Sequence, residues 1–137
     1  MNKEYNDINY VFVTRDANGT LVGLKDSTWK YKLEPSRGSD INPDHIKLTI
    51  EEAHRVNYDP EHSQDSSKPR RIYYRFDGHP IAEKNHLVMF KVVVEENTKT
   101  GVDEVVTAHF MSNLRGESSR GAVIYDAGTA NRHTSHI

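Results

Sequence analysis

The sequence has no cysteine in 137 residues and no long hydrophobic run. Without cysteine, a disulfide scaffold, a thiol nucleophile and a cysteine-based zinc site are excluded. No window approaches about 18 consecutive apolar residues, and the N-terminus MNKEYNDINY lacks the segments of a secretory signal, so we expect no membrane span and no signal peptide in this chain. The motifs GxGxxG, GxxxxGK(S/T), GxSxG and HExxH are also absent, which leaves nucleotide cradles, nucleophile elbows and zinc-protease helices without support.

Core-forming residues are scarce as well. Leu, Ile, Val and Phe make up 30 of the 137 residues, only just above the level typical of disordered chains. We therefore expect a single domain, residues 1–137, with one modest core and a poorly ordered C-terminal tail.

The net charge is small, but the charged residues are unevenly distributed along the chain. The formal net charge is −2. Residues 1–67 carry 8 Lys and Arg against 12 Asp and Glu, whereas residues 68–137 carry 10 against 8. Four of those ten cations lie within residues 68–75, interleaved with tyrosines. This pattern predicts a local basic strand of the kind that contacts nucleic acid.

The N-terminal region, residues 1–42, has the pattern of a β-hairpin. Residues 8–14 and 20–24 are rich in β-formers, and Asn18-Gly19 between them suits a tight turn. Residues 28–33 alternate apolar and charged side chains, which predicts a third short strand.

The next 68 residues, 43–110, form the predicted core of the domain. Apolar residues spaced by three or four predict a helix within residues 44–58, ended by Asp59-Pro60. Alternating residues then predict strands at 70–76, 86–95 and 103–110. We expect their helix-facing side chains to be Ile72, Tyr74, Phe76, Val88, Phe90, Val92, Val106, Ala108 and Phe110, and their polar face to hold Arg71, Tyr73, Arg75, Lys91, Thr107 and His109.

These elements together predict an α+β fold, with a helix packed on an antiparallel β-sheet and an N-terminal β-hairpin. Residues 111–137 are expected to be a C-terminal extension that ends in a partly disordered tail.

Two histidines suit proton transfer on RNA. His45 lies at the predicted start of the helix and His109 on the polar face beside Thr107. RNA carries its own nucleophile, the 2′-OH, so cleavage needs a base, an acid and cations around the phosphorus, but no metal or cofactor. Arg70, Arg71, Arg75 and Lys91 are the candidate phosphate-binding residues, and Tyr73 is a candidate for base stacking.

Each of these residues also has an ordinary structural interpretation. A histidine at a helix start is often a cap or a packing partner, and arginines on a strand often pair with acidic neighbours. Tyrosine is a common half-buried strand residue. His133 and His136 have no third ligand nearby, so we expect solvated histidines there and no metal site.

The chain resembles the barnase/EndoU/colicin/RelE-like (BECR) ribonuclease superfamily, and within it phage-encoded proteins and contact-dependent bacterial toxin nuclease domains. The resemblance covers residues 43–110. It is carried by Pro43-Asp-His45-Ile-Lys-Leu-Thr49, Asp59-Pro60, the basic-aromatic strand, and Glu104-Val-Val-Thr107-Ala-His109.

The resemblance implies His45 as the acid/base, Thr107 as the hydroxyl at the scissile phosphate and one of Arg70, Arg71 and Arg75 as the phosphate binder. His109 occupies a place where the family often has an aromatic residue, so it is either a second acid/base or a substitution without a role. It implies a metal-independent endoribonuclease toxin that cleaves tRNA or another structured RNA to a 2′,3′-cyclic phosphate. Such a toxin acts in the cytoplasm, of its own cell or of one into which it is delivered, and is paired with an immunity protein. The alternative is a non-enzymatic protein-binding module, such as a phage inhibitor or an immunity-type protein, which the acidic first half favours.

Overall fold

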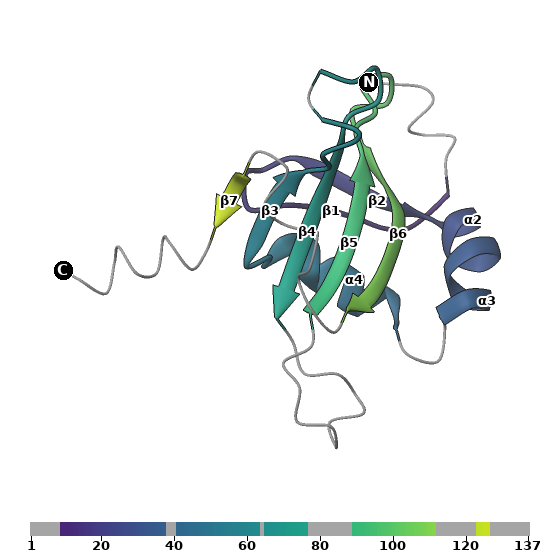
Figure 1. Cartoon of the computed structure of the whole chain (residues 1–137). Coiled ribbons are helices and arrows are strands. Elements are labelled where there is room, and N and C mark those ends of the chain that lie inside the picture. Colours follow the sequence, from purple (N-terminus) through teal and green to yellow (C-terminus); the bar gives the residue numbers. More distant parts are fainter. Residues whose placement is uncertain (1–8, 38–40, 64, 77–88, 112–122, 127–137) are drawn as a thin grey trace.

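A computed structural model of the chain describes residues 9–37, 41–63, 65–76, 89–111 and 123–126. Within these ranges a seven-stranded sheet, in the order β1-β2-β6-β5-β4-β3-β7, is combined with several helical segments (Figure 1). The elements are β1 (Tyr10–Arg15), β2 (Leu21–Lys25), α2 (Asp26–Thr28), the π-helical turn η1 (Trp29–Leu33), α3 (Glu34–Arg37), α4 (Pro43–Glu51), β3 (Arg55–Tyr58), β4 (Arg70–Phe76), β5 (Met89–Glu95), β6 (Asp103–Met111) and β7 (Val123–Asp126).

The expected α+β fold with an N-terminal hairpin is confirmed. Gly19 has a φ of 85°, as the predicted turn requires, and the Asp16 carboxylate accepts hydrogen bonds from two backbone N–H groups of the same turn. The sheet is mixed and not wholly antiparallel, because β2 pairs in parallel with β6 through Val22–Asp103 and Gly23–Glu104. From that junction the hairpin crosses behind β4 and β5, on the side of α4 (Figure 1).

Helix α4 begins where the sequence predicts and ends earlier. The Asn42 side chain accepts a hydrogen bond from the His45 backbone N–H at 2.9 Å, and Pro43 occupies the first turn, where it removes no helical hydrogen bond. Ile46 and Ile50 are fully buried against the sheet. The prediction of a helix reaching residue 58 is wrong, because residues 55–58 form strand β3 and pair with β4.

The strand predicted at residues 28–33 is also wrong. Those residues lie in a continuous helical segment from α2 through η1 to α3. Trp29 and Leu33, one helical turn apart, pack in the core, while Tyr31 between them is 78% exposed. Residues 29 and 33 share one face in a strand and also in a helix. Tyr31 would lie on that face in a strand but points away from it in a helix, so only its exposure distinguishes the two patterns.

The two faces of the sheet carry separate clusters of buried residues. The cluster on the α4 side includes Tyr73, Phe90, Val92 and Ala108. The cluster on the opposite face, called here the open face only because α4 does not cover it, is formed by the buried residues Ile72, Tyr74, Met89 and Val93, with Val106 packed against it.

The predicted side-chain phase was right for β5 and for part of β6, and wrong for β4. Arg71, Tyr73 and Arg75 share the helix face, because their Cα partners are Val94, Val92 and Phe90. Lys91, Thr107 and His109 lie on the open face as expected. Val106 joins the open face because a β-bulge shifts the register between Val93 and Val94.

Several expectations fall outside the described residues. They include the strand residues 86–88 and the disordered tail expected at the C-terminus, of which residues 127–137 are not described. Among the residues that are described, no helix is long and apolar enough to cross a membrane.

The close approach of β2 to its neighbours gives a test of this arrangement. A Cβ atom at Gly23 would lie 2.6 Å from Cε1 of Tyr10 and 3.1 Å from Cγ1 of Val102. We predict that Gly23→Ala lowers the free energy of unfolding by about 1–3 kcal/mol, because the ring must move to make room. Ala17→Ser in the exposed turn is the control and should change stability by less than about 0.5 kcal/mol in chemical denaturation. Equal stability of both variants would contradict the packing of the hairpin.

Candidate functional site

A row of polar side chains crosses the open face. The Cα atoms of Arg55 and Tyr74 are register partners, as are those of Tyr74 and Lys91, and those of Lys91 and His109. Direct partners in antiparallel strands project to the same face with Cβ atoms about 5 Å apart. The four residues, called here the polar row, therefore run side by side across β3, β4, β5 and β6.

The polar row combines an arginine and a lysine with one imidazole. Arg55, Lys91 and His109 are half-buried, so each keeps some contact with solvent, while Tyr74 is fully buried between them. Thr107, also half-buried, precedes His109 by two residues on the same strand and lies on the same face. This arrangement can hold a phosphate group next to a proton-transfer group.

The structure separates His45 from the polar row. The His45 ring stacks on Phe90 with centroids 4.3 Å apart and planes 9° apart, and it also contacts Phe110 at 5.4 Å. Both phenylalanines face α4 and pack in or against its core cluster. The sheet itself thus lies between His45 and His109, so the predicted catalytic set of His45, Thr107 and His109 does not come together.

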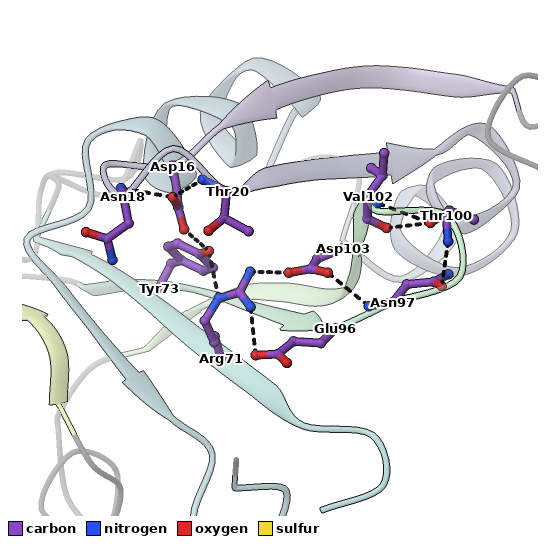
Figure 2. Close-up of polar contacts among 10 residues, drawn as sticks. All are labelled: Asp16, Asn18, Thr20, Arg71, Tyr73, Glu96, Asn97, Thr100, Val102 and Asp103. Atoms are coloured by element: carbon purple, nitrogen blue, oxygen red, sulfur yellow. Dashed lines mark hydrogen bonds and ion pairs between the residues drawn. The ribbon is translucent and has the colours of Figure 1, made fainter. Parts of the chain in front are cut away.

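Arg71 and Tyr73 belong to a buried network on the helix side (Figure 2). Arg71 is 6% exposed. Its Nη2 donates to Asp103 at 2.7 Å, its Nη1 to Glu96 at 3.0 Å and its Nε to the Tyr73 hydroxyl at 3.1 Å. The Tyr73 hydroxyl in turn donates to Asp16 at 2.7 Å. The predicted roles of Arg71 in phosphate binding and of Tyr73 in base stacking therefore do not fit their places in the fold.

The pKa values of Arg71 and Tyr73 keep each of these two groups in one protonation state. Burial alone lowers the pKa of the Arg71 guanidinium, but the interactions with Tyr73 and Asp103 outweigh burial and raise it. Burial raises the pKa of the Tyr73 hydroxyl, and the contact with Asp16 adds to this against the opposing charge of Arg71. Arg71 is consequently a cation and Tyr73 a neutral donor at every physiological pH.

The other two predicted phosphate-binding arginines are also engaged. Arg70 pairs with Glu95 at 3.0 Å, and Nη1 of Arg75 donates to the backbone carbonyl of Glu52 at 2.6 Å, just beyond α4. Of the four predicted phosphate-binding residues, Lys91 alone lies in the polar row.

Sequence reasoning missed Arg55 and Tyr74. The sequence pattern predicts Arg55 within the helix and Tyr74 on the helix-facing side of β4. The alternation of Arg55, Val56, Asn57 and Tyr58 after the helix was the signal that could have indicated a strand.

The described residues contain no group of three or more His, Asp or Glu placed to hold a metal ion. Comparisons of the chain with family models, with curated proteins and with solved structures found no match.

The stacked position of His45 gives one test. We predict that His45→Ala lowers the free energy of unfolding by about 1–2 kcal/mol, because an aromatic stack is lost while the backbone N–H that Asn42 caps remains. Any RNA cleavage should keep its wild-type rate per folded molecule, measured on the same samples as thermal unfolding. A large loss of rate at unchanged stability would return His45 to the catalytic set.

The buried network gives a second test. Arg71→Met should cost about 3–5 kcal/mol of unfolding free energy, because it leaves the 8%-exposed Asp103 charged and unpaired. Asp103→Asn in the same background removes that charge and keeps an acceptor for the Asn97 backbone N–H, so it should restore part of the loss. Urea denaturation of the two single variants and the double variant measures this coupling, and strictly additive effects would rule it out.

Proposed function

We propose that the chain is an endoribonuclease that needs no metal ion and whose site is the polar row with Thr107. The observation that carries the proposal is the direct pairing of Lys91 with His109, in one row with Arg55, on the face of the sheet opposite α4. The resemblance of residues 43–110 to the BECR ribonucleases supports the same reaction class. It implies His45 as the acid/base, but the sheet separates His45 from the polar row, so the proposal moves this role to His109.

The reaction divides among neighbouring side chains. His109 as a neutral imidazole accepts the proton of the ribose 2′-OH while O2′ forms a bond to phosphorus. The P–O5′ bond breaks, and the ammonium of Lys91 donates a proton to the leaving oxygen. Arg55 neutralises the charge on the non-bridging oxygens of the pentacoordinate phosphorus, and the Thr107 hydroxyl donates a hydrogen bond to one of them. The products are a 2′,3′-cyclic phosphate and a 5′-OH.

The proposed substrate and partner are those that the resemblance implies. They are tRNA or another structured RNA, and an immunity protein whose acidic surface would cover the cations of the open face.

This function is tested by removing the paired residues one at a time. We predict that His109→Ala lowers the rate of RNA cleavage by about 10²–10⁴-fold, the usual value of general acid–base transfer, and that Lys91→Met has a comparable effect. Both variants should remain folded, since each side chain is only half-buried. Activity should persist in excess chelator, and the ends of the products can be identified by mass spectrometry.

Matched controls lie away from the open face. His62→Ala removes a histidine from the loop after β3, and Lys47→Met removes a lysine from α4, so both should cleave at the wild-type rate. Loss of activity in chelator with rescue by Mg²⁺ would contradict the mechanism. Absence of cleavage by the folded wild type would instead favour the protein-binding alternative.

A further inference from the structure

The helical segment beside β6 exposes a tyrosine between two lysines. Tyr31 is 78% exposed, the most exposed of the large apolar side chains that the structure describes. Its neighbours Trp29 and Leu33 are anchored in the core, so the ring is presented from a fixed backbone. Widened π-helical turns of this kind are frequent at functional sites.

Charge on this turn favours an anionic partner. Lys30 and Lys32 flank Tyr31. Among the described residues, Lys30 is paired with a carboxylate only through a long i,i+4 contact with Asp26 at 3.8 Å. Lys32 lines a surface pocket whose two acidic residues already have cationic partners, because Glu95 pairs with Arg70 at 3.0 Å and Glu104 with Lys25 at 2.9 Å. Within the described part of the chain, Lys32 itself pairs with no carboxylate.

This surface adjoins the open face. The pocket that Lys32 lines also includes Val106, the residue before Thr107, and β6 continues from there to His109 (Figure 1). His109 lies three positions after Val106, which is about 10 Å along a strand. An RNA strand that is held in the polar row and continues along β6 can therefore reach the pocket that Lys32 lines.

We propose that Lys30, Tyr31 and Lys32 form a docking surface for a single-stranded part of the RNA substrate, with a base stacked on Tyr31 and the phosphates beside the lysines. The proposal rests on the proposed function and adds that the RNA substrate is single-stranded where it contacts Tyr31. An exposed tyrosine can stack only on a base whose face is open, as in loops, bulges and ends, whereas the bases of a duplex are already stacked on each other.

The test compares a long substrate with one too short to reach Tyr31. In Tyr31→Ala, KM for an unstructured RNA oligonucleotide should rise about tenfold at unchanged kcat, as expected for the loss of one stacked base. Cleavage of a dinucleoside monophosphate should stay at the wild-type rate. Lys32→Ala should weaken binding of the oligonucleotide and reduce its salt dependence. Binding is measured separately by fluorescence anisotropy in the inactive His109→Ala background.

The controls separate the two proposals. Val11→Ala removes a second exposed large apolar side chain of the described residues, from β1, and should leave KM unchanged. Wild-type kinetics of Tyr31→Ala on both substrates would overturn the docking surface and leave the ribonuclease standing. An equal loss of activity on both substrates would also overturn the docking surface, because the dinucleoside monophosphate is too short to contact Tyr31. Tyr31-dependent binding of RNA without cleavage by the wild type would overturn the ribonuclease and support the surface.

Discussion

The fold depends on the buried ion pair between Arg71 and Asp103. A guanidinium removed from water is tolerated only when its donors find acceptors, and here Nε, Nη1 and Nη2 each have one, from β4, the end of β5 and the start of β6. Through Tyr73 the same network reaches Asp16 in the β1–β2 turn (Figure 2). The parallel junction between β2 and β6 consists of only two residue pairs, one of them including Asp103. The network therefore adds polar contacts between the hairpin and the sheet to the packing of Val22 and Leu24 in the core.

Because Arg71 is buried in this network, β4 does not supply the cations of the proposed site. The basic composition of β4 suggests a cationic stripe for RNA, but Arg71 is used in the core, Arg75 binds the backbone beyond α4, and Arg70 pairs with Glu95. The cations of the polar row come instead from β3 and β5, with His109 from β6. A site assembled from four strands is set by strand register, which no local segment of the sequence contains.

The parts of the structure that local rules determine were predictable, namely the Asn18-Gly19 turn, the start of α4 and the inward phase of Phe90, Val92 and Ala108. The errors occurred where two periodicities coincide. Trp29 and Leu33 suit a strand or a helix, and Val56 continues the helical stripe although it is buried in β3. On β4 both alternating sets contain tyrosine, so hydrophobicity favoured Ile72 and Tyr74 as the helix-facing set. The two carboxylates that allow Arg71 to be buried lie 25 and 32 positions away in the sequence, beyond any local pattern.

The β-bulge in β6 allows one strand to supply side chains both to the core network and to the proposed site. Before the bulge, Asp103 and Val105 project toward α4, where Arg71 and the main core need them. A regular strand would continue this alternation and place Thr107 and His109 on the same side, in contact with the core. The extra residue, Val106, reverses the phase, so that Thr107 and His109 reach the open face while Ala108 fills the core and Phe110 packs against it. The residue that ties the hairpin to the sheet and the histidine proposed for catalysis can therefore share one strand only because that strand is irregular between them.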